Sequence, residues 1–155
     1  MDWVEWFTSA RRDPRPERVV RRAARPGEGR HLRLEVLEVA GDVEEIFASK
    51  VSAAKWGRMS PAEQREWMAG EIERKTARAE ARREGPGRLV VKSTGVKRLR
   101  LLLGPDDLPP EGAVVVTLNG RAHRRTVTSD AAVLLREFAA TLDRSFLPVA
   151  EIAVP

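Results

Sequence analysis

The sequence predicts a mainly β domain: an antiparallel, immunoglobulin-like β-sandwich with a short N-terminal helix and a helical insertion. Runs in which apolar and polar residues alternate recur along the chain, as at 31–39 and 97–103. Tight-turn signals such as Asn119-Gly120 separate these runs. Short strands with tight turns are typical of sandwiches, and only one long segment, 60–84, carries both the start and the stop signal of a long helix.

The composition supports a single folded domain. The chain has 155 residues, of which 42% are hydrophobic and 33% charged, which is enough apolar material for a core. No run approaches 18 consecutive apolar residues, so no membrane span is expected. The first residues are acidic and aromatic, unlike a signal peptide, and the default expectation is a cytoplasmic protein. The absence of cysteine excludes disulfides and cysteine-ligated zinc.

The N-terminal segment is predicted to form a short helix over 2–10, because Trp3, Trp6 and Phe7 lie three and four residues apart and share one face. Pro14 and Pro16 then exclude any continuation of this helix. The predicted organisation has three parts: an N-terminal docking segment at 1–12, a proline linker at 13–16 and a sandwich domain at 17–155.

Three strands are predicted in the first part of the sandwich, at 17–23, 31–39 and 43–51. Along 31–39 the alternation places Leu32, Leu34 and Val36 on one face, with Arg33 on the other. The turn Pro26-Gly27-Glu28-Gly29 separates the first two strands.

A helical insertion is predicted at 51–86. Its helix begins at the N-cap Ser60, where Glu63 completes a capping box, and ends at Gly85. The second half, 74–84, is almost wholly charged residues and alanine, which predicts that this half projects into solvent.

The apolar residues of the insertion allow two interpretations. They are Trp56, Trp67, Met68 and Ile72. These side chains either cover an open edge or face of the sandwich, or form a recognition element for a partner. Exposed sheet edges need cover, which favours the first interpretation.

The C-terminal half is predicted to contain five strands and one helix. The strands are 88–92, 97–103, 113–118, 121–127 and 145–154, and the helix runs from Ser129 to Leu142. Asn119-Gly120 predicts a type I′ hairpin turn, which needs positive φ at both positions.

Nothing in the sequence indicates catalysis, and neither a cofactor nor a metal is expected. His31 and His123 are the only histidines, and the chain has no G-x-S-x-G elbow, so both are interpreted as surface residues. Asp106 and Asp107 lack the spacing of metal ligands and are interpreted as solvated turn residues.

The chain is strongly basic, with a formal net charge of +5 and a pI near 10.4. Nucleic-acid or anionic-surface binding is therefore the alternative function. The arginines that would serve it are Arg11, Arg12, Arg15, Arg18, Arg21, Arg22 and Arg25. The positive charges otherwise read as scattered, and the nearby aromatic residues have helical spacing, which favours packing over base stacking.

Four short patterns follow one another in a distinctive order. They are Trp6-Phe7 with Arg11 to Pro16, Leu34 to Val36, Val114 to Gly120, and Asp143 to Ser145 leading to Ala150-Glu151-Ile152. In this order they resemble the region that follows the catalytic domain in bacterial α/β-hydrolase proteins. These are esterase- or peptidase-like serine hydrolases similar to dienelactone hydrolase and polyhydroxybutyrate depolymerase. The resemblance covers 3–50 and 87–154, while 51–86 departs from it.

The resemblance implies a non-catalytic accessory β-sandwich with a structural or substrate-positioning role. The family's catalytic serine, acid and histidine would precede Met1, so no residue here inherits their roles. The implied partner is a hydrolase catalytic domain, in the same precursor or in a separate chain. The residues expected to dock on it are Trp3, Trp6, Phe7, Arg12, Asp13, Pro14 and Pro16.

Overall fold

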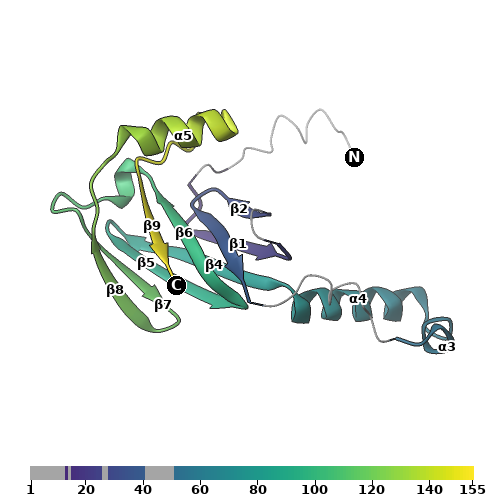
Figure 1. Cartoon of the computed structure of the whole chain (residues 1–155). Coiled ribbons are helices and arrows are strands. Elements are labelled where there is room, and N and C mark those ends of the chain that lie inside the picture. The colour runs from purple at the N-terminus through teal and green to yellow at the C-terminus, as the bar shows by residue number, and fades with distance from the viewer. Residues whose placement is uncertain (1–12, 14, 26–27, 41–50) are drawn as a thin grey trace.

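Two β-sheets pack face to face in the computed structural model, which describes residues 13, 15–25, 28–40 and 51–155 (Figure 1). The five-stranded sheet, called sheet A, has the order β1-β4-β5-β7-β8. Its strands are β1 (Arg18–Ala23), β4 (Ala77–Gly85), β5 (Arg88–Thr94), β7 (Ala113–Leu118) and β8 (Arg121–Thr126). The prediction of a mainly β, two-sheet fold is confirmed.

The four-stranded sheet, called sheet B, has the order β2-β3-β6-β9. Its strands are β2 (Gly29–His31), β3 (Leu34–Val39), β6 (Val96–Leu103) and β9 (Ala150–Val154). The helices are α3 (Ala53–Trp56), α4 (Pro61–Lys75), the 3₁₀ turn η1 (Pro105–Asp107) and α5 (Ala131–Thr141). No helix among the described residues is long and apolar enough to cross a membrane.

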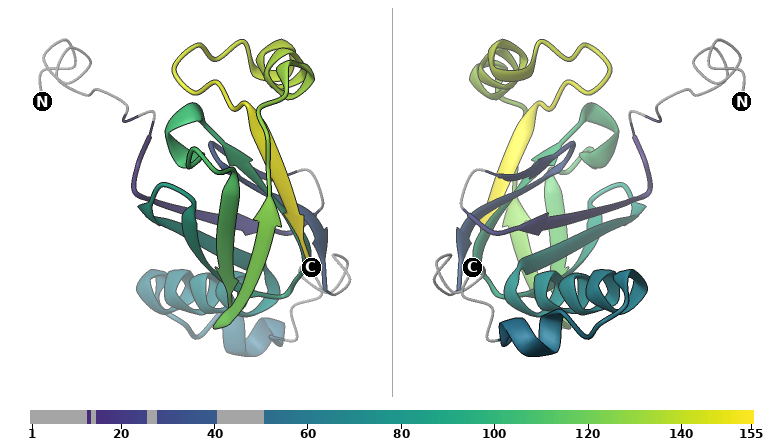
Figure 2. Two further views of the ribbon diagram at one scale, coloured as in Figure 1. Left: turned by 90° about the vertical axis from the view of Figure 1, so that its left-hand side faces the viewer. Right: turned by 90° about the vertical axis from the view of Figure 1, so that its right-hand side faces the viewer.

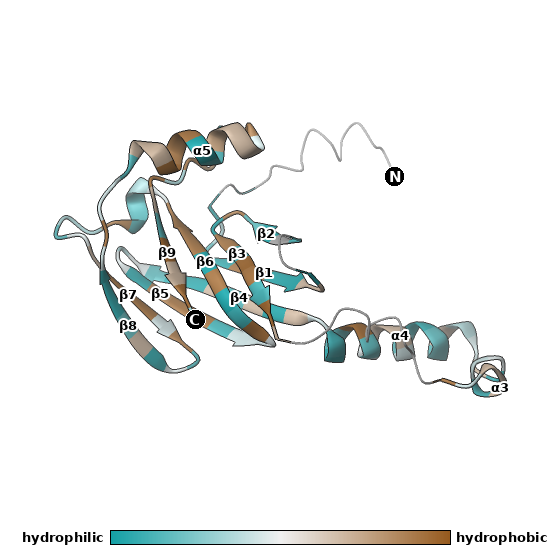
Figure 3. Cartoon of the chain, viewed as in Figure 1, coloured by the Kyte–Doolittle hydropathy of each residue, from teal (hydrophilic) through white to brown (hydrophobic). Residues whose placement is uncertain are grey.

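The core lies between the sheets and consists of the alternating apolar residues of their strands (Figure 3). Leu99, Leu101 and Leu103 of β6 are fully buried, as their alternation predicted. Burial of such a side chain contributes about 1.5–3 kcal/mol to stability. β3 and β6 pack against β4, whose core-facing residues are alanines, so large and small side chains meet across the interface.

The predicted long helix is shorter than expected. α4 ends at Lys75, and Ala77–Gly85 forms β4, which hydrogen-bonds to β1 on one side and to β5 on the other. The expectation that this half projects into solvent is therefore wrong. Alanines occupy alternate positions, 77, 79 and 81, and all three are buried. Sheet pairing and burial override the helix propensity of these residues.

One strand pair departs from the antiparallel prediction, because β5 and β7 run parallel, with Val90 opposite Thr117. β6 lies between them in the sequence but belongs to the other sheet. The hairpin that follows is as predicted. Asn119 and Gly120 have φ of 47° and 84°, the positive values that this tight turn between β7 and β8 needs.

Several predicted boundaries differ from the observed ones. The strand predicted at 31–39 is broken at Leu32, which has a φ of 48°, and Arg33 turns inward and is buried. The N-cap of α5 is Asp130 and not Ser129, and the last strand begins only at Ala150. The predicted helix at 2–10 and the predicted strand at 43–51, apart from its last residue, lie outside the described residues.

Candidate functional site

The proline linker is tied to one end of the sandwich. The backbone N–H of Arg15 donates to Asp13 Oδ1 at 2.8 Å, and the Arg15 guanidinium forms an ion pair with Asp106 in η1. Arg83 of β4 donates to the backbone carbonyl of the same Asp106. Pro16 is half-buried beside these contacts. The chain therefore enters the sandwich along a path fixed by η1.

Two of the predicted docking residues lie within the described part of the chain. Asp13 and Pro16 are described, but the remainder lie outside the described residues: Trp3, Trp6, Phe7, Arg12 and Pro14. Their docking role stays a prediction.

A buried ion triad lies next to η1. Asp107 Oδ1 is 3.3 Å from Arg33 Nη1 and 3.1 Å from Arg83 Nε, and Asp107 Oδ2 accepts the backbone N–H of Gly104 at 2.9 Å. Asp107 is only 5% exposed, so its interpretation as a solvated turn residue is wrong. This triad locks the turn between β2 and β3 to the end of β6, because Arg33 lies in that turn and Gly104 follows β6.

The insertion forms an arm, made of α3 and α4, that extends away from both sheets (Figure 1). The rings of Trp56 and Trp67 meet edge to face with centroids 5.6 Å apart, and this contact holds the two helices together. The capping box of Ser60 and Glu63 is present as predicted. The hydrogen bond from Ser60 lowers the pKa of the Glu63 carboxyl.

The arm does not cover the sandwich, which contradicts the interpretation of its apolar residues as sheet cover. No residue of α3 or α4 is buried, and Met68 and Ile72 are 49% and 47% exposed. An ion pair of 2.6 Å between Glu73 and Arg22 of β1 ties the arm to sheet A. The interpretation as a partner-recognition element stays a prediction.

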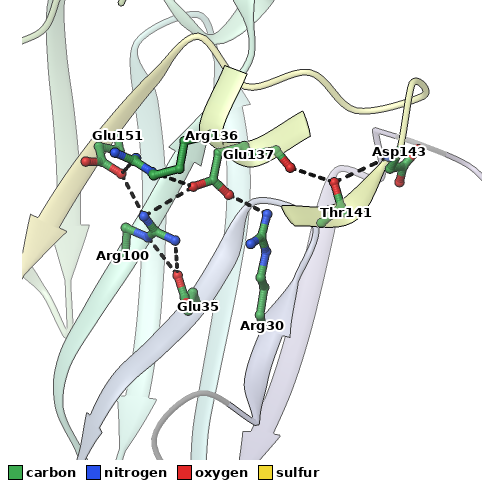
Figure 4. Close-up of polar contacts among 8 residues, drawn as sticks. All are labelled: Arg30, Glu35, Arg100, Arg136, Glu137, Thr141, Asp143 and Glu151. Carbon is green, nitrogen blue, oxygen red and sulfur yellow. Dashed lines mark hydrogen bonds and ion pairs between the residues drawn. The ribbon is translucent and has the colours of Figure 1, made fainter. Parts of the chain in front are cut away.

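A second buried charge network joins α5 to the outer side of sheet B (Figure 4). Glu137 of α5 is 2% exposed, and its carboxylate contacts Arg30 of β2, Arg100 of β6 and Arg136. Arg100 also binds Glu35 at 2.7 Å and Glu151 at 2.9 Å. Burial disfavours the charged form of Arg100, yet the hydrogen bond and charge of Glu35, together with Glu137 and Glu151, outweigh it and raise the pKa of Arg100.

Beside this network an open pocket of about 330 Å³ lies between the β2–β3 turn and the C-terminal end of α5. Arg30, His31, Thr141 and Asp143 provide its polar lining. Arg30 already binds Glu137, and Asp143 accepts the backbone N–H of Ser145. The charged groups that line the pocket therefore already bind other residues of the fold, which indicates a structural role for them.

The two histidines do not form a catalytic arrangement with the described residues. His31 is exposed at the end of β2, and His123 lies on β8 opposite Val116. No hydrogen bond joins either imidazole to a described serine or acid. No group of three or more potential metal ligands occurs in the described part of the chain.

Three of the five described arginines that suggested nucleic-acid binding pair with carboxylates. Arg15 pairs with Asp106, and Arg22 pairs with Glu73. Arg18 makes two bonds to Glu80, at 2.7 and 2.9 Å, and this hydrogen bonding raises the pKa of Arg18 and lowers that of Glu80. Of the seven, Arg11 and Arg12 lie outside the described residues.

The buried charges were missed in the sequence, although one of them leaves a signal there. Glu137 follows Val133 by four residues and so shares the apolar face of α5, where a carboxylate needs a partner. Asp107 and Arg33 come from distant turns, and no spacing rule connects them.

No protein-family model, curated protein or solved structure matches the chain.

Proposed function

We propose that this protein is a non-catalytic accessory β-sandwich domain that holds or positions the catalytic domain of an α/β-hydrolase-type serine hydrolase. The catalytic domain belongs to the same precursor or to a separate chain. Two things support the proposal: the order of the four short patterns in the sequence, and the presence of two elements suited to docking. These elements are the N-terminal segment 1–12 and the arm of α3 and α4.

The exposed arm is the observation that carries the proposal. Met68 and Ile72 lie one turn apart on α4, each about half exposed, and neither sheet covers them. A helix that buries no residue against its own domain is stabilised mainly by capping and ion pairs, here the capping box and the Glu71–Lys75 pair. Such a helix is suited to bridging between domains, where the partner covers the apolar residues.

The anchored linker supports a positioning role. Because Arg15 and Arg83 both bind Asp106, the described end of the linker, Arg15 and Pro16, is tied to η1. A catalytic domain joined or docked there would be held in one orientation, since two prolines stiffen the linker. A flexible linker with no contact to the sandwich would not fix the orientation of the catalytic domain.

The test uses the hydrolase catalytic domain encoded next to this chain, in the same reading frame or the neighbouring one. Isothermal titration calorimetry would compare the unaltered chain with the double variant Met68→Ser/Ile72→Ser. Loss of two apolar anchors should weaken binding by about tenfold or more. The matched control is Leu135→Ser/Leu142→Ser, two exposed leucines away from the arm, which should bind normally. Equal loss in both variants, or no neighbouring hydrolase, would overturn the proposal.

The N-terminal segment is tested separately. Trp3→Ser/Trp6→Ser should weaken binding of the catalytic domain and change the free energy of unfolding of the sandwich by no more than about 1 kcal/mol. Thermal unfolding followed by circular dichroism measures the second quantity. Collapse of the whole fold in this double variant would show that the tryptophans belong to the core and not to a docking surface.

A further inference from the structure

The outer face of sheet A, the side turned away from the core and called here the basic face, gathers cations from four strands. The register fixes which side chains point outward: Val19, Ala81 and Val91 are buried partners in one row, so their neighbours in the chain face away from the core. Among the helices of the described chain, α5 contacts β9 of the other sheet and α4 buries no residue, so no helix covers the basic face (Figures 1 and 2).

Arginines meet directly across β1 and β4. Arg18 lies opposite Arg82, and Arg22 lies opposite Arg78. Like charges directly opposite each other destabilise a sheet. Glu80 relieves part of the repulsion by binding both Arg18 and Arg78, the latter at 2.8 Å.

The cations of β5 and β8 have no such relief. Arg88 and Lys92 of β5 and Arg124 of β8 are exposed, and no described carboxylate lies within ion-pair distance of them. Together with the four arginines above, they make seven cations on the face, against three carboxylates that pair there: Glu80, Glu84 and Glu73, which reaches Arg22 from α4. This surplus of four positive charges compares with a formal net charge of +5 for the entire sequence. Most of the net positive charge therefore lies on this face.

The same face carries an apolar patch between its cations. Val90, Thr117 and Ala122 form one cross-strand row, and Val115 lies in the next row between Arg88 and Arg124. Small apolar side chains ringed by charged ones are the arrangement of a protein–protein interface, with a dry centre and a polar rim. Among the described residues, the outward positions of these strands include no aromatic side chain on which a base could stack.

We propose that the basic face is a docking surface for a protein partner that presents an acidic, aliphatic surface. Carboxylates of the partner would pair with Arg88, Lys92 and Arg124, and its aliphatic side chains would cover the valine patch. A phosphate polymer would gain nothing from the valines and would be repelled by Glu80 and Glu84, so the observations favour a protein. This inference does not depend on the partner being a hydrolase or on the arm.

The test uses two fluorescein-labelled peptides of equal length and charge, one with Glu-Leu-Glu-Gly repeats and one with Glu-Ser-Glu-Gly repeats. Fluorescence anisotropy measures binding to the full chain, with a short duplex DNA as third probe. The leucine peptide should bind several-fold more tightly than the serine peptide and the DNA. Equal binding of the two peptides, or tighter binding of the DNA, would overturn the proposal. Either result would show that the surface recognises negative charge alone.

Two variants with the same change in charge locate the binding. Arg88→Gln/Lys92→Gln/Arg124→Gln should weaken binding of the leucine peptide by about tenfold or more, because three exposed ion pairs are lost together. The control Arg65→Gln/Arg98→Gln/Arg144→Gln removes three cations elsewhere and should change binding less than about threefold. Equal weakening in both would show that net charge and not the basic face attracts the peptide. Circular dichroism confirms that both variants are folded.

Discussion

Asp107→Asn is the substitution that most directly tests how this sandwich tolerates buried charge. The change preserves the size of the side chain and removes the negative charge that Arg33 and Arg83 share. Arg33 is nearly fully buried, with a side chain 3% exposed, so it cannot recover its interactions from water. The Gly104 N–H also loses its charged acceptor.

The magnitude follows from the burial of each partner. Removing one member of a buried ion pair costs about 3–5 kcal/mol, because the other charge stays buried and uncompensated. Arg83 is 27% exposed on its side chain and can be hydrated, which places the expected loss near the lower end, about 3 kcal/mol. In a chain of this length such a loss lowers Tm by about 6–12 °C.

Urea unfolding followed by circular dichroism measures the loss. Asp106→Asn is the matched control, since Asp106 is exposed and its pair with Arg15 should contribute no more than about 1 kcal/mol. Arg33→Met should cost less than Asp107→Asn, because Asp107 keeps Arg83 and no buried charge is left alone. If Asp107→Asn and Asp106→Asn destabilise the protein equally, the buried triad does not stabilise the fold and the reasoning is wrong.

Two further predictions concern the other charged clusters. Glu137→Gln should reduce the free energy of unfolding by about 3 kcal/mol, and Glu151→Gln should reduce it by about 1 kcal/mol or less, because only Glu137 is fully buried. Chemical denaturation of both variants measures these losses, and equal losses would contradict the argument. Glu80 has a folded-state pKa below its usual value, so its stabilising effect is complete above the unfolded carboxyl pKa, about 4.3, and is lost as the pH falls through the folded pKa. Glu80→Gln should therefore destabilise the protein at neutral pH, and the difference from the unaltered chain should shrink below about pH 4; a difference that persists there would point to packing and not to charge.

The strands with large apolar residues at every second position could be predicted from the sequence. In 97–103 and 113–118 the alternation is carried by leucine and valine, whose burial drives sheet formation whatever their neighbours do. The turn at Asn119-Gly120 was predictable for a local reason, since few residues adopt positive φ twice in succession. The helix start at Ser60 was equally local.

The strand β4 was not predictable by the same criterion. Alanine has the highest helix propensity and is a weak indicator of burial, so alternating alanines and charged residues look like the end of a solvated helix. Alanine is favoured at these positions of β4 for two reasons that lie outside the segment. β4 pairs with β1 and β5, and the leucines of sheet B pack against its small side chains. Information of this kind resides in the partner strands and not in the segment itself.

The surface charges show the same dependence on register. Arg82 and Arg88 are six residues apart in the sequence, with a turn between them. No local sequence pattern indicates that Arg18 lies opposite Arg82, or that Arg124 lies in the same cross-strand row as Arg88. Once β4 is a strand, however, every second residue of five strands must point outward, and the cations collect on one side. The error at β4 therefore hid the basic face as well, because a projecting helix would have spread Arg78 and Arg82 into solvent away from the sheet. A feature of the surface that no short motif encodes thus follows from the correct assignment of a single central strand.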